Sequence, residues 1–155
     1  ILISDSSLSM PLLLQVAAGL DAIDRPDLAM KACRAASERD SQQAQPYYDL
    51  GYYAARCGYP PRISESLARK AVSLSPQTIS YRIGLMSLLM KQDRYDDACE
   101  IIQDLSNEQI DCIHCRCCLQ RIASLYEFAG DYRRTTLCRQ KLLTLELSSN
   151  ESSCG

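Results

Sequence analysis

Hydrophobic residues recur at intervals of three and four along almost the whole chain, which is the spacing of amphipathic helices. No segment shows the two-residue alternation of a half-buried strand. Proline, glycine and short polar clusters interrupt the pattern at intervals and mark helix ends. The pattern therefore predicts an all-α protein, with helices over residues 10–23, 27–40, 44–57, 62–74, 78–91, 95–105, 108–129 and 132–147.

Small residues recur at similar positions after the interruptions. They are Ala29, Ser64, Ala98 and Thr135, with separations of 35, 34 and 37 residues. A small side chain lets two helices approach closely. Gly58 and Gly130 stand where a helix must end, a position that favours left-handed backbone. The first unit has no Gly-Asp turn. We therefore expect a series of similar helical hairpins.

A period near 34 residues with two helices per unit resembles the tetratricopeptide repeat. The second unit carries the resemblance best, through Tyr47, Leu50, Gly51, Ala54, Gly58, Ser64, Ala68, Ala71 and Pro76. The resemblance covers residues 10–147 and implies a right-handed superhelix of antiparallel hairpins, with about eight helices. A related helical-hairpin array is the alternative. Residues 1–9 would form an N-terminal extension and residues 148–155 a flexible tail.

The resemblance also implies a function, because the first helices of such hairpins line a concave groove that binds a peptide or helix of another protein. The positions that match this groove are Tyr48, Asp49, Tyr52, Arg56, Ser87, Lys91, Gln120 and Arg121, with Ser124 and Phe128 further along the last of these helices. Tyrosine and arginine are enriched among the residues that dominate binding energy. We therefore expect a scaffold for a protein partner.

Composition excludes several other classes of function. The net charge of −2 gives no basis for binding nucleic acid or an anionic membrane, and no apolar run is long enough to span a bilayer. No phosphate loop, dinucleotide fingerprint or zinc-protease motif is present, so we expect neither an enzyme nor a cofactor. The nine cysteines are odd in number and unevenly spaced, which favours reduced thiols and a cytoplasmic or nuclear location.

A cysteine cluster between residues 112 and 118 suggests a second function, a zinc or thiol sensor. The metal ligands would be Cys115, Cys118, His114 and Cys138. Ser106 and Gln109 read as a capping box that starts a helix before the cluster. On one continuous helix Cys112 and Cys115 would join an apolar stripe with Leu119, Ile122, Tyr126 and Ala129, so we expect them in the core and no bound metal.

The two ends of the repeat region suggest a third function. The first helix and the last helix are both more apolar than a solvent-facing cap of a repeat array should be. Self-association, or a neighbouring segment of a larger assembly subunit, would cover them.

Overall fold

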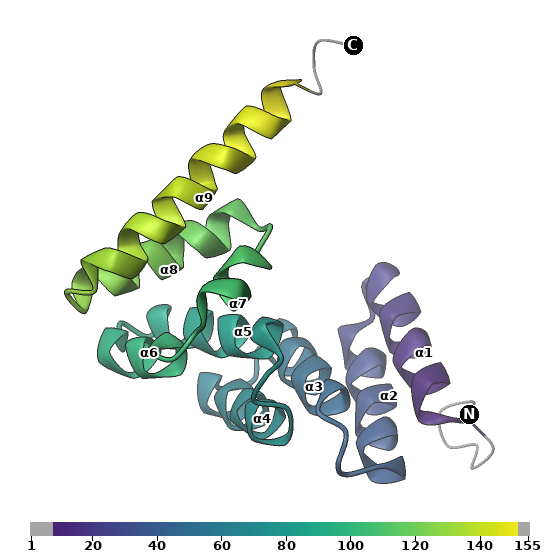
Figure 1. Cartoon of the computed structure of the whole chain (residues 1–155). Coiled ribbons are helices and arrows are strands. Elements are labelled where there is room, and N and C mark those ends of the chain that lie inside the picture. Colours follow the sequence, from purple (N-terminus) through teal and green to yellow (C-terminus); the bar gives the residue numbers. More distant parts are fainter. Residues whose placement is uncertain (1–7, 152–155) are drawn as a thin grey trace. The chain divides into compact units, whose positions relative to one another are not determined.

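The structure is a computed structural model that describes residues 8–151, with side chains described as far as residue 148. Within this range every regular element is a helix (Figure 1). The helices are α1 (Met10–Ala22), α2 (Pro26–Arg39), α3 (Gln45–Arg56), α4 (Pro61–Leu74), α5 (Ile79–Met90), α6 (Tyr95–Ile102), α7 (Asn107–Asp111), α8 (Arg116–Phe128) and α9 (Tyr132–Glu151).

The predicted all-α fold of helical hairpins is confirmed, with three corrections to helix boundaries. The predicted helix 108–129 is two helices, α7 and α8, separated by residues 112–115. Helix α6 ends at Ile102 rather than at residue 105. Helix α9 continues to Glu151, beyond the predicted end at residue 147. The expected extension and tail lie largely outside the described residues.

Four hairpin turns share one geometry. Each has a residue with positive φ, between 57° and 78°, two or three positions after the last residue of the first helix. These residues are Asp24, Gly58, Asp93 and Gly130, spaced 34, 35 and 37 apart. The amide of the next residue donates to a carbonyl five residues earlier, at 2.8 to 3.1 Å, as in a Schellman cap. The first hairpin thus has the same turn as the others, formed by an aspartate, which tolerates left-handed backbone better than most residues.

The small residues predicted from the repeat lie at helix contacts. Ala29 and Ala98 have no exposed surface, and Ser64 and Thr135 are almost as buried. In the second hairpin a methyl group added at Gly51 would lie 3.2 Å from the Ser64 carbonyl oxygen, so α3 and α4 nearly touch at the backbone. Small side chains at these positions are therefore required by the helix spacing.

The chain divides after Tyr81 into two compact units. In the first unit α1 packs on α2, α2 on α3 and α3 on α4 (Figure 1). Its main core gathers side chains from α1, α2 and α3, namely Ala17, Ala29, Ala32, Cys33, Leu50 and Tyr53. Among the described helices, none combines the length and apolar character needed to span a bilayer.

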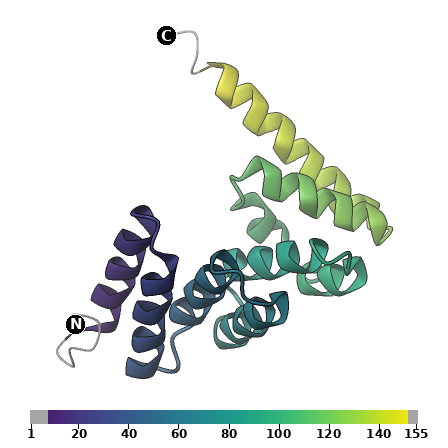
Figure 2. The ribbon, with the colours of Figure 1, turned by 180° about the vertical axis from the view of Figure 1, so that it is seen from behind.

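In the second unit α8 and α9 lie side by side, and α9 extends well past α8 (Figure 2). The C-terminal end of α6 is fixed by side chains from three other helices, which bond to the carbonyls of residues 101 to 103. The Arg82 guanidinium of α5 donates to the Ile101 carbonyl at 2.9 and 2.6 Å. The Tyr126 hydroxyl of α8 donates to the Ile102 carbonyl at 2.9 Å, and the Arg134 guanidinium of α9 donates to the Gln103 carbonyl at 2.6 Å. The last carbonyls of a helix lack amide partners within it, so these side chains, together with the Leu105 amide at 3.2 Å from the Ile102 oxygen, satisfy what the helix end leaves open.

The break between α7 and α8 follows from the positions of the buried residues. Ile110 and Leu119 are both fully buried, and Ile113 is nearly so. Nine residues are about 2.5 turns of an α-helix, so a continuous helix would place Ile110 and Leu119 on opposite faces. The irregular segment 112–115 brings both side chains into the core. Cys112 and Cys115 are exposed as a result, and the prediction that they belong to the core is wrong.

Alanine substitutions at Gly58, which has a positive φ, and at Gly19, which lies within α1, test the turn assignment. Neither Gly58 nor Gly19 has another atom within 4 Å of an added methyl group. We expect Gly58→Ala to lower the free energy of unfolding by about 1 kcal/mol, because φ is positive there. Gly19→Ala, within α1, should raise it by about 0.5 to 1 kcal/mol. Urea unfolding of both variants checks this, and equal effects would contradict the turn assignment.

Ala98 tests the close contact in the third hairpin. Its side chain is fully buried. We expect Ala98→Leu to lower the free energy of unfolding by about 1–3 kcal/mol, because a closed contact cannot accept the extra volume. Glu100→Leu, at an exposed position of the same helix, serves as the control. Thermal unfolding followed by circular dichroism measures both, and an unchanged melting temperature for Ala98→Leu would show that the contact is loose.

Candidate functional site

The predicted binding residues of the first unit lie on α3, but three of the four are held within the unit. The ring of Tyr48 packs on Tyr81, with centroids 4.9 Å apart. The guanidinium of Arg56 pairs with Asp21 and, at 2.8 Å, with Asp24 in the first hairpin turn. Arg56 therefore ties the end of α3 to the preceding hairpin. Tyr52 is exposed and available for contact.

Asp49 takes part in a polar chain rather than projecting as an isolated carboxylate. The Tyr81 hydroxyl donates to the Gln45 amide oxygen at 2.7 Å, and the Gln45 amide nitrogen donates to Asp49 at 2.7 Å. Asp49 is half-buried, and this burial raises its pKa despite the hydrogen bond from Gln45. Its charge in turn contributes to the raised pKa of Cys33, which burial brings to about 12.

The predicted binding residues of the second unit are more open. Lys91, Gln120 and Arg121 are exposed, and Ser87 is half-buried. Arg121 of α8 donates to the Ser87 hydroxyl of α5 at 3.3 Å, which brings two of the predicted residues together. Arg121 has no carboxylate partner among the described residues, so its positive charge can still pair with a ligand.

An apolar hollow lies on the same face of α8, one to two turns beyond Arg121. Its volume is about 250 Å³, and it is lined by Met90, Tyr95, Ser124, Leu125 and Phe128. The rings of Tyr95 and Phe128 lie 5.9 Å apart, yet Phe128 remains 60% exposed and Tyr95 39%. The sequence analysis placed Ser124 and Phe128 on this surface but missed Met90, Tyr95 and Leu125. The packing of α6 beside α8 adds Tyr95.

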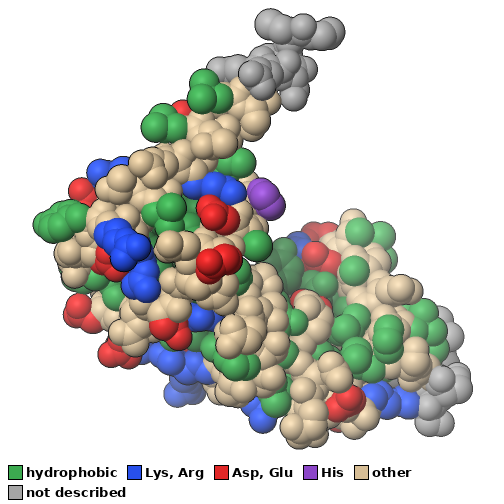
Figure 3. Space-filling view, viewed as in Figure 1, with side chains coloured by type: hydrophobic (Ala, Val, Ile, Leu, Met, Phe, Trp, Pro, Cys, Tyr) green, Lys and Arg blue, Asp and Glu red, His purple; other side chains and the backbone are tan. Residues whose placement is uncertain are grey.

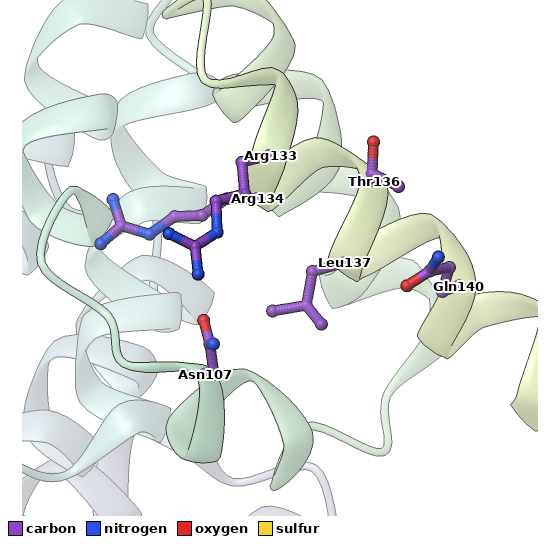
Figure 4. Close-up of a pocket in the computed structure, with 6 residues that line it drawn as sticks. All are labelled: Asn107, Arg133, Arg134, Thr136, Leu137 and Gln140. Atoms are coloured by element: carbon purple, nitrogen blue, oxygen red, sulfur yellow. The ribbon is translucent and has the colours of Figure 1, made fainter.

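A second, more polar hollow lies between α7 and α9. Its volume is about 440 Å³, and its lining residues are Asn107, Arg133, Arg134, Thr136, Leu137 and Gln140 (Figure 4). Arg134 is already bound to Asp131 and to the carbonyl of Gln103. Leu137 is the one apolar side chain in this lining, so this hollow offers little surface for burying an apolar group.

The cysteine cluster gathers at the start of α8. The sulfur atoms of Cys115, Cys117 and Cys118 all lie within 4.8 Å of one another, and those of Cys115 and Cys117 are 3.1 Å apart. Two of the ligands predicted from sequence, Cys115 and Cys118, belong to this group. Of the other two, His114 is exposed and outside the group. Cys138 of α9 is fully buried and lies near Tyr126, which is further along α8 than the cysteine cluster.

Cys115 and Cys118 differ in their acidity. Hydrogen bonds from the Cys118 and Cys117 side chains, and from their backbone amides, lower the pKa of the Cys115 thiol to about 7. Cys115 is the N-cap residue of α8, so its thiol also lies at the positive end of that helix. Burial raises the pKa of Cys118 to about 12. Cys115 is thus the thiol of this pair that ionises first.

The acidity of Cys115 predicts a pH-dependent reactivity. In reduced protein kept with a chelator, we expect the alkylation rate of Cys115 by iodoacetamide to be half-maximal near pH 7, because the thiolate is the nucleophile. An unperturbed cysteine thiol would reach its half-maximal alkylation rate at about pH 8.5. Peptide mass spectrometry resolves the site. A half-maximal rate for Cys115 above pH 8 would contradict the prediction.

Solved structures of other proteins share the fold of this chain. The sequence matches no known protein family and no curated protein. The structure is similar to MamA, with a TM-score of 0.68 at 18% identity over 92% of this chain and 81% of that one. It is also similar to PilF of Pseudomonas aeruginosa, with a TM-score of 0.73 at 18% identity over 92% of this chain and 64% of that one.

A third similar structure is MamA of Desulfovibrio magneticus RS-1, with a TM-score of 0.67 at 14% identity, over 88% of this chain and 75% of that one. At these identities the likeness concerns the fold. MamA and PilF are tetratricopeptide-repeat proteins. With its repeated hairpin turns and small contact residues, this chain has a tetratricopeptide-like fold.

Proposed function

We propose that the protein is a scaffold that binds a segment of another protein on the surface formed by α5, α6 and α8 in the second unit. The observation that carries this proposal is the pair of exposed aromatic rings, Tyr95 and Phe128, beside an apolar hollow of about 250 Å³. Exposed aromatic side chains beside a hollow are typical of binding surfaces, since they bury a large area on contact and lose little conformational freedom.

The surface also specifies the chemistry of its ligand. Residues 121, 124, 125 and 128 share one face of α8, and seven residues correspond to about 10 Å along a helix. A ligand that fits would place a large apolar side chain against Phe128 and an acidic side chain at Arg121. A partner helix with these two side chains about two turns apart meets this spacing. Lys91, exposed directly after α5, adds positive charge to the same unit.

A peptide-display selection on the full chain would test the proposal. We expect the selected peptides to share an apolar and an acidic side chain at this spacing. Phe128→Ala should then weaken binding about thirtyfold, the effect of losing a residue worth about 2 kcal/mol. Arg121→Ala should weaken binding less and remove most of its dependence on salt, because surface charge pairs are screened.

Matched controls exist in the same unit. Tyr132, 71% exposed at the start of α9, is an aromatic residue outside the hollow, and Arg133 is an exposed arginine that lines the other hollow. Tyr132→Ala and Arg133→Ala should leave binding unchanged. If Phe128→Ala binds the selected peptides as tightly as Tyr132→Ala does, the proposed surface is not the binding site.

The alternative function, self-association through an apolar end, has one specific observation in its favour. Leu143 and Leu147 lie four residues apart on α9 and are 59% and 68% exposed. Hydrophobic side chains on this helix are visible on the surface in Figure 3. Light scattering distinguishes the two functions, since a dimer that is lost in Leu143→Lys would assign α9 to self-association.

A further inference from the structure

Three cysteines converge because of where they stand relative to the start of α8. Cys115 occupies the N-cap position, directly before the first turn of α8. Cys117 and Cys118 stand two and three residues later, within that first turn. The three sulfur atoms consequently lie within 4.8 Å of one another. None of the three cysteines lines the hollow of the proposed partner surface.

The segment that carries these thiols is anchored at both ends by α9. Lys141 donates from its ammonium group to the carbonyl of Asp111, directly before the break. Arg116, directly after Cys115, pairs with Glu146 at 2.6 Å. Cys115 thus lies in a segment held on both sides, and Cys117 and Cys118 lie in the first turn of α8, which reduces the conformational freedom lost when they bind a common ligand.

We propose that Cys115, Cys117 and Cys118 form a three-thiolate site for a monovalent soft metal ion, Cu(I). Three sulfurs at metal–sulfur bonds of about 2.3 Å lie about 4 Å apart around a trigonal ion. The 3.1 Å separation of Cys115 and Cys117 must widen by about 0.9 Å, and both side chains are exposed and can rotate to do so. Each thiol that binds loses its proton to solvent, and no oxidation or reduction is involved.

The number of ligands favours Cu(I) over Zn(II). Structural zinc sites are closed by four ligands. Among the described residues, the group whose metal-binding atoms lie within 4.8 Å of one another consists of these three thiols and contains no fourth ligand. Soft thiolates suit both Cu(I) and Zn(II), but three sulfurs complete a trigonal Cu(I) site, whereas they leave the fourth position of zinc to water. The positive end of the α8 dipole also stabilises the negative charge that thiolates bring.

The test is a titration of the reduced full chain with Cu(I) under anaerobic conditions, in competition with the chromophoric chelator bicinchoninate. We expect one tightly bound Cu(I) per chain, and X-ray absorption should count three sulfur neighbours. Cys117→Ser should weaken the affinity by about a hundredfold, since loss of a direct ligand should cost at least as much as loss of a residue that supports one.

Cys112→Ser is the matched control, because Cys112 is exposed in the same irregular segment but lies outside the group. It should keep one Cu(I) at unchanged affinity, and circular dichroism should show both variants folded. The proposal is overturned if Cys112→Ser loses as much affinity as Cys117→Ser. It is also overturned if Zn(II) binds with four ligands in preference to Cu(I), or if Cys115 and Cys117 form a disulfide that persists with reductant and no ion binds.

Discussion

The left-handed residue that ends the first helix of each hairpin is the constraint on which the other contacts depend. It reverses the chain in a fixed way, so that the second helix returns along the first, and it recurs at residues 24, 58, 93 and 130. The same reversal sets the small residue five or six positions later against the preceding helix, where Ala29, Ser64, Ala98 and Thr135 are buried. Glycine adopts this conformation without strain, and aspartate does so at a modest cost. In the first hairpin Arg56 binds the turn aspartate, which joins that turn to α3.

The second unit adds a different kind of constraint, because polar side chains determine where α6 ends. Arg82, Tyr126 and Arg134 come from three helices and bond to successive carbonyls at one helix terminus. A buried carbonyl without a partner is unfavourable, so these bonds favour one arrangement of the surrounding helices. The same arrangement brings α6 beside α8, and with it Tyr95 beside Phe128. The proposed partner surface is therefore a consequence of how α6 is held.

The residues predicted to line the groove differ in how far they are engaged within their own unit. Eight residues were expected to line one groove, and in the first unit Tyr48, Asp49 and Arg56 are largely engaged by Tyr81, Gln45 and the first hairpin turn. In the second unit Arg121 and Ser87 remain on an open face beside an apolar hollow. The helix face of each residue could be predicted, because periodicity fixes it. The partners of each side chain could not, because an arginine side chain reaches neighbours that are distant in sequence.

The sequence by itself determined the helical hairpins, their period and the small residues at their contacts, since 3.6-residue periodicity and the steric demands of tight turns are local properties. It also contained the signal for the break after α7, because Ile110 and Leu119 cannot share a face of one continuous helix. That signal competed with an apparent stripe through Cys112 and Cys115, and cysteine is apolar enough to fit a core. Only the tertiary structure decided between them, because burying two isoleucines and a leucine releases more apolar surface from water than burying two thiols. The same choice left three thiols together at the surface, at the start of α8.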